Sequence, residues 1–156
     1  MRLRKLRRLD EARQEILRAI KCNEGIGHSG SVWNNWTNLA NIETDAGNLA
    51  AAAKAKGKAI ASYLAYRRAG GENHDTPGRL FYAVTEAIQK GDRGEAERVI
   101  AEYRERWIDD ENPEADALQA IVAGSRDRTL ADAPDLDYTM AAEILFLIET
   151  LEQPPA

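Results

Sequence analysis

Three glycines in one short segment have the spacing of a nucleotide-binding motif. Gly25, Gly27 and Gly30 match the pattern G-x-G-x-x-G. This motif holds the pyrophosphate of a dinucleotide only when a strand precedes it and a helix begins just after it. Here the preceding residues, "QEILRAIKCNE", read as the end of a helix, and no lysine follows in a G-K-[ST] arrangement. The sequence therefore favours a joint between two helices over a phosphate site, and we expect no cofactor.

One cysteine and two histidines are the other candidates for chemistry. Cys22 and His28, with His74 and Asp75, would form a metal site only if two loops met, and their spacing does not match structural zinc sites. A nucleophile pair of Cys22 and His28 would need an oxyanion pocket that nothing in the sequence indicates. We therefore expect no metal site and no catalytic residue, and we predict that this chain is not an enzyme.

Composition narrows the class of protein further. The chain has 156 residues, of which 44% are hydrophobic and 30% charged, a globular rather than a disordered composition. The sequence contains no run of 18 apolar residues, which is about the length needed for a helix to span a membrane. A net charge of -5 argues against general nucleic-acid binding, although residues 1–8 carry five Lys or Arg side chains that could contact RNA or form a solvated helix face. The single cysteine predicts a reducing, cytoplasmic location.

An internal repeat indicates how the chain is organised. The segments "RRLDEARQEILRAI", "GNLAAAAKAKGKAI" and "GDRGEAERVIAEYR" align, each with a turn residue (Arg7, Gly47 or Gly91) followed five positions later by an alanine. The turn residues are 40 and 44 positions apart, which is the length of one helix-turn-helix unit with a few loop residues. Gly47 and Gly91 are expected to end helices in the left-handed conformation.

Hydrophobic periodicity predicts about seven helices and no strand. Thr76-Pro77 and Asn112-Pro113 have the pattern of helix starts, and Asp137 can cap a final helix. The expected packing positions of the two central helices are Val32, Trp33, Trp36, Leu39, Ala40 and Glu43, then Leu49, Ala52, Ala53, Ala59, Ile60, Tyr63 and Leu64. The predicted fold class is therefore all-α.

The spacing W-x2-L-A-x6-G-x4-A-x6-A, which runs from Trp36 to Ala59, resembles the tetratricopeptide repeat. This resemblance implies a short right-handed α-solenoid formed by a single domain, 1–156. Its predicted parts are a partial first unit at 1–24, units at 31–69 and 76–108, and a helical cap at 112–152. The sequence departs from the family pattern at Arg7, where glycine is usual, at Glu43, where an aromatic residue is common, and at Lys56, where a large apolar residue is usual.

The C-terminal part also resembles the end of large bacterial tetratricopeptide proteins. In those proteins the repeats follow an NTPase or effector domain, so an alternative function is a C-terminal sensor or regulatory segment of a larger protein. The partial first unit would leave an apolar helix face uncovered, and two copies could pair through their N-terminal helices as a homodimer.

The leading function implied by the resemblance is a non-catalytic scaffold that binds a protein or peptide partner. In such stacks the first helix of each unit lines a groove, and amide side chains can hydrogen-bond to the backbone of an extended peptide. A solvated polar face that binds nothing has the same pattern. The predicted peptide-binding residues are Asn34, Thr37, Asn38, Asn41, Asp45, Phe81 and Thr85.

Overall fold

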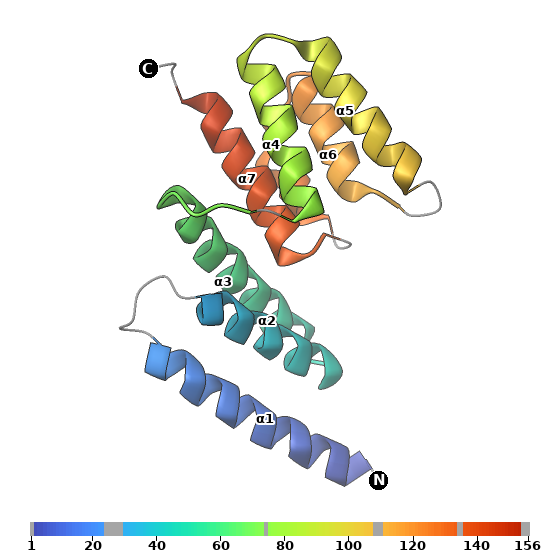
Figure 1. Ribbon diagram of the computed structural model, residues 1–156. Coiled ribbons are helices and arrows are strands. Elements are labelled where there is room, and N and C mark those ends of the chain that lie inside the picture. The colour runs from blue at the N-terminus through green and yellow to red at the C-terminus, as the bar shows by residue number, and fades with distance from the viewer. Residues whose placement is uncertain (1, 24–29, 74, 108–110, 134–135, 154–156) are drawn as a thin grey trace. The chain divides into compact units, whose positions relative to one another are not determined.

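The computed structural model describes residues 2–23, 30–73, 75–107, 111–133 and 136–153. Within these ranges the chain forms seven α-helices and one 3-10 helix, and no strand, so the all-α prediction is confirmed (Figure 1). The chain divides into two compact units, Met1–Ala69 and Gly70–Ala156. Each unit is described by itself below. None of the described helices is long and apolar enough to cross a membrane.

Three helices form the first unit: α1 (Arg2–Asn23), α2 (Gly30–Asp45) and α3 (Leu49–Arg68). The helix α2 packs against both α1 and α3. A small core joins Ile20 of α1, Leu39 of α2 and Ala55 of α3, each at most 8% exposed. Burial of apolar side chains from all three helices is therefore the main source of the stability of this unit.

The turn predicted at Arg7 is wrong, because α1 is one continuous helix of 22 residues through that position. The segment contains neither glycine nor proline, and its arginine, lysine and leucine residues are good helix formers. The N-terminal segment is therefore a single long helix rather than the end of a helix-turn-helix unit.

The turn between α2 and α3 has the predicted form. Gly47 has a φ of +81°, and Gly91 occupies the same conformation with a φ of +75°. The Gly47 N–H donates to the carbonyl of Thr44 at 3.0 Å, and the Asn48 N–H donates to the carbonyl of Glu43 at 2.8 Å. These bonds satisfy carbonyls that the end of α2 would otherwise leave without partners.

The packing face of α3 consists mostly of alanine. Ala52, Ala55 and Ala59 are buried, and their small side chains allow α2 and α3 to approach closely. Leu49 was predicted on this face and is 71% exposed, so that prediction is wrong. The buried positions recur every three or four residues from Ala52, and Leu49 continues this spacing one turn earlier. It is the first residue of α3, however, and lies beyond the packed part of the helix.

Two glycine substitutions should have opposite effects on the first unit. We expect Gly47→Ala to lower the free energy of unfolding by about 1–2 kcal/mol, because alanine adopts a positive φ at a cost. Gly57→Ala is the matched control: Gly57 lies inside α3 with nothing within 4 Å of an added Cβ. Alanine should stabilise that position by about 0.5–1 kcal/mol. Urea unfolding of both variants measures the difference, and equal effects would contradict the assignment of the turn.

The second unit contains α4 (Thr76–Gln89), α5 (Arg93–Arg106), α6 (Pro113–Val122), the 3-10 helix η1 (Arg128–Asp132) and α7 (Tyr138–Glu152). Contacts join α4 to α5, α6 and α7, and α5 to α6. The largest fully buried side chains of this unit come from α4, α6, α7 and the segment before α7: Val84, Leu118, Ile121, Leu136, Ile144, Leu147 and Ile148. The unit therefore has its own apolar core.

The helix starts of the second unit largely follow the sequence prediction. The Asp137 carboxylate accepts from the Met140 N–H at 2.8 Å, which confirms the predicted cap of α7. At α4 the capping residue is Asp75, whose carboxylate accepts from the Gly78 N–H at 2.7 Å, and Thr76 is already helical. Aspartate is a strong N-cap residue. The cap of α4 is therefore Asp75, one position before the cap predicted from Thr76-Pro77.

Candidate functional site

The polar residues predicted on α2 share one exposed face of that helix. Asn34, Asn38, Asn41 and Asp45 are all exposed. Their spacings of four, three and four residues place them in a single row along a helix of 3.6 residues per turn. We call these four residues the α2 stripe. The side chains of the stripe supply amide donors, amide oxygens and one carboxylate.

The opposite face of α2 fixes the helix in the first unit. Leu39 is 8% exposed and lies in the core with Ile20 and Ala55, and Trp36 and Ala40 pack against that core. A helix anchored along its length loses little conformational entropy when a ligand binds its outer face. The α2 stripe is therefore presented on a rigid support.

A cluster of three aromatic rings joins α2 to α3. The Trp33 ring lies 5.4 Å from the Tyr63 ring at an interplanar angle of 81°, and 5.1 Å from the Tyr66 ring. The edge-to-face contact between Trp33 and Tyr63 adds about 0.5–1.5 kcal/mol to the effect of burial alone. The cluster lies near the start of α2, at the end opposite Asp45.

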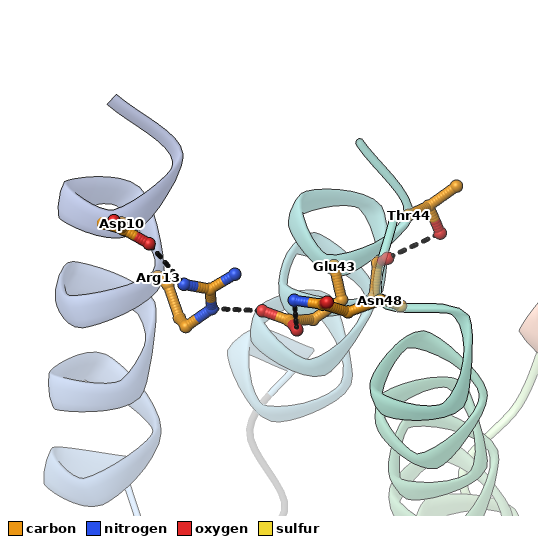
Figure 2. Close-up of polar contacts among 6 residues, drawn as sticks. Asp10, Arg13, Glu43, Thr44 and Asn48 are labelled. Atoms are coloured by element: carbon orange, nitrogen blue, oxygen red, sulfur yellow. Dashed lines mark hydrogen bonds and ion pairs between the residues drawn. The ribbon is translucent and has the colours of Figure 1, made fainter. Parts of the chain in front are cut away.

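At the C-terminal end of α2, Glu43 is a buried carboxylate held by two other parts of the chain. Figure 2 shows Arg13 of α1 and Asn48, the residue before α3, both directed at its side chain. Arg13 Nε donates to Glu43 Oε1, and Asn48 Nδ2 donates to Oε2 at 3.0 Å. Arg13 Nη1 also donates to Asp10 at 2.6 Å. Glu43 is only 6% exposed, so these bonds replace water that its charge would otherwise require.

Electrostatics at this cluster favour the charged form of Glu43. The hydrogen bond from Arg13 holds the pKa of Glu43 below its ordinary value, against burial, which raises it, and with a further lowering contribution from Asn48. The same bond raises the pKa of Arg13. The cluster therefore acts as an ionised anchor that joins α1 to the end of α2 and the start of α3. Sequence reasoning placed Glu43 on the packing stripe without finding its partners.

The threonine hydroxyls predicted to bind peptide already donate within their own helices. Thr37 Oγ1 donates to the Trp33 carbonyl at 2.9 Å, and Thr85 Oγ1 donates to the Phe81 carbonyl at 2.7 Å. These hydroxyl hydrogens are engaged in bonds to the carbonyl four residues earlier. Each threonine therefore retains only acceptor capacity toward a ligand.

The prediction that Phe81 contacts a peptide is contradicted by its burial. Phe81 is 2% exposed and belongs to the interior of the second unit, whereas its neighbour Tyr82 is 69% exposed. Phe81 lies within the apolar face of α4, beside the buried residues Leu80 and Val84. The predicted groove would also combine α2 with α4, which belong to different units, and it stays a prediction.

The candidates for nucleotide and metal chemistry fall largely outside the described residues. Residues 24–29, with His28 and the first two motif glycines, and His74 are among those that the structure does not describe. On either side of the glycine motif the chain is helical, since α1 ends at Asn23 and α2 begins at Gly30. Among the described residues no three His, Cys, Asp or Glu side chains are grouped to hold a metal ion.

Comparison of the chain with models of protein families, with curated proteins and with solved structures found no match. The class of the protein is therefore defined by its own structure. It is an all-α protein of two compact units. In the first unit, the helix α2 has a row of exposed polar side chains on one face and packs in the core with its opposite face.

Proposed function

We propose that the protein is a non-catalytic interaction module that binds a polypeptide along the α2 stripe. The observation that carries this proposal is the exposed row Asn34, Asn38, Asn41 and Asp45 on a helix whose other face is anchored in a core. The resemblance of the repeat pattern to tetratricopeptide proteins supports the same class of function. A free, exposed thiol at Cys22 suits a reducing compartment, and we propose a cytoplasmic location.

The geometry of the stripe suits an extended peptide. Asp45 lies eleven positions after Asn34 along the helix, a length of about 16 Å at 1.5 Å per residue. An extended peptide covers that length with about five residues. Asparagine amides both donate and accept, so Asn38 and Asn41 can bond to alternating N–H and carbonyl groups of a peptide backbone. Such bonds give affinity with little dependence on the peptide sequence.

Replacing both central amides should weaken peptide binding strongly and leave folding intact. We expect Asn38→Ala with Asn41→Ala to raise the dissociation constant at least about tenfold, since each lost hydrogen bond contributes about 1 kcal/mol. Stability should not fall, because both sites are exposed and alanine is a better helix former than asparagine. Peptide ligands would first be selected from a random display library by their binding to the immobilised chain. Their affinities for each variant would then be measured by fluorescence anisotropy.

A matched control removes an amide from another helix of the same unit. Gln14 is exposed on α1, and Gln14→Ala should leave peptide affinity unchanged. If the double variant binds the selected peptides as tightly as the unmodified chain does, the α2 stripe is not the binding surface.

A further inference from the structure

Asp45 is the one charged residue of the α2 stripe. The other three residues of the stripe are uncharged asparagines. The helix α2 contains no Lys or Arg, and its remaining acidic residue, Glu43, is buried and bonded to Arg13. Asp45 is exposed and is the last residue of the helix. The stripe therefore has a neutral end and a negative end.

The position of Asp45 is electrostatically unfavourable within its own helix. The C-terminus of a helix has a partial negative charge, so a cation there stabilises the helix and a carboxylate destabilises it. The last turn of α2 has no basic residue, and Glu43 and Asp45 are both among the final three residues. Asp45 therefore opposes the stability of α2 unless a positive charge lies beside it.

The chain compensates only one of these two carboxylates. Glu43 accepts hydrogen bonds from Arg13 and from Asn48. The carboxylate of Asp45, in contrast, has no ion pair and no hydrogen bond with any other residue that the structure describes. A local rule that is broken without compensation inside the fold is expected mainly at functional sites. The missing positive charge is therefore expected from a ligand.

The neighbouring ion cluster does not provide that charge. Arg13 donates to Asp10 as well as to Glu43, so two carboxylates share one guanidinium (Figure 2). Residues 1–69 contain 13 Lys or Arg and six Asp or Glu, a net charge of +7. Charges more than about 10 Å away are largely screened at about 0.1 M salt, however. The net charge of the unit therefore does not decide which group binds at Asp45.

We propose that the α2 stripe selects extended peptides that have a lysine or arginine side chain at the Asp45 end. Asn41 and Asp45 are four positions apart, which is about 6 Å along a helix. Alternate residues of an extended peptide point to the same side and are about 6.6 Å apart. The cationic residue therefore lies two positions from the peptide residue opposite Asn41. This inference rests on the proposed function and adds to it the charge of one peptide residue.

Parallel selections on two forms of the chain test the charge preference. A random peptide display library is selected on the immobilised unmodified chain and, separately, on Asp45→Lys. We expect the unmodified chain to enrich Lys or Arg at one peptide position, and Asp45→Lys to enrich Asp or Glu at that position. Lysine is favourable at the end of a helix, so the variant should fold, which circular dichroism checks.

Glu15→Lys is the matched control for this selection. Glu15 is exposed on α1 and has no ion pair with the other described residues, and the substitution changes the net charge as Asp45→Lys does. It should select the same peptides as the unmodified chain. A reversal of the preferred charge by Glu15→Lys as well would mean that the net charge of the protein, rather than Asp45, sets the preference.

Affinities of synthetic peptides measure the size of the effect. Asp45→Asn should raise the Kd of a selected, N-terminally acetylated peptide about two- to fivefold, the effect of one exposed ion pair. The Kd of the same peptide with alanine at the cationic position should not change. Fluorescence anisotropy measures both, and the ratio should approach one when salt is raised from about 50 to about 500 mM.

The outcomes separate this inference from the proposed function. If Asn38→Ala with Asn41→Ala weakens binding but Asp45→Lys selects the same peptides as the unmodified chain, the stripe binds peptides and the charge preference is wrong. If the double variant binds the selected peptides as tightly as the unmodified chain does, the proposed function fails and this inference fails with it. Binding that requires a free peptide N-terminus instead of Lys or Arg would also overturn the inference, because the cation at Asp45 would not be a side chain.

Discussion

Glu43→Ala is expected to lower the free energy of unfolding of the first unit by about 2–3 kcal/mol, below the 3–5 kcal/mol found when a fully buried ion pair loses one partner. The side chain of Arg13 is 26% exposed, so water compensates for part of the loss. The substitution also leaves the Asn48 amide without its carboxylate acceptor. Urea unfolding at neutral pH, followed by circular dichroism, measures the change.

The variants Glu43→Gln, Arg13→Ala and the double alanine variant separate charge from packing. Glutamine keeps a hydrogen-bonding side chain of similar size, so its effect should be about half that of alanine. A double-mutant cycle between Arg13 and Glu43 should give a coupling of about 1–2 kcal/mol. A coupling near zero would mean that the ion pair does not hold α1 to α2.

The pH dependence of stability tests whether the Glu43 carboxylate is ionised in the folded chain. Because the pKa of Glu43 is lower in the folded chain than in the unfolded chain, the carboxylate stabilises the fold above the unfolded pKa of about 4.3. That stability is lost as the pH falls through the lower, folded pKa. The difference in stability between the unmodified chain and Glu43→Gln should therefore shrink between about pH 5 and pH 3. A difference that grows on acidification would contradict an ionised anchor.

Local signals in the sequence were sufficient to predict much of the fold. Gly47, Gly91 and Asp137 occupy the turns and the cap predicted for them, because each depends on interactions within a few residues. The pairing of Arg13 with Glu43 joins residues 30 positions apart, and only the packing of α1 on α2 brings them together. A glutamate on an apolar stripe was the available signal, since a buried carboxylate requires a donor. The sequence does not specify which arginine supplies it.

The candidate site was predictable to the extent that one helix defines it. The α2 stripe follows from the helical period, because its four residues recur at spacings of four, three and four. On α4 the same reasoning misplaced Phe81, because Phe81 and Tyr82 are consecutive aromatic residues at the edge of an apolar face. Which of the two is buried depends on contacts with other helices, and α4 packs against α5, α6 and α7. Periodicity alone does not supply that information.

The same pair of aromatic residues provides the second large expected effect. Phe81→Ala should lower the free energy of unfolding by about 3–5 kcal/mol, because it removes a large buried side chain and leaves a cavity. Tyr82→Ala on the adjacent, exposed position should change it by less than about 0.5 kcal/mol. Urea unfolding of the two variants compares residues that differ mainly in burial.

Hydrogen exchange can assign this loss to one unit. In Phe81→Ala, the backbone amides of α4, α6 and α7 should exchange faster, because these helices form the core that Phe81 helps to fill. The amides of α2, whose core lies around Leu39, should exchange as in the unmodified chain if the two compact units unfold separately. Equal losses of stability from Phe81→Ala and Tyr82→Ala would instead mean that α4 presents Phe81 to solvent. That result would again support the prediction from the sequence that Phe81 contacts a bound peptide.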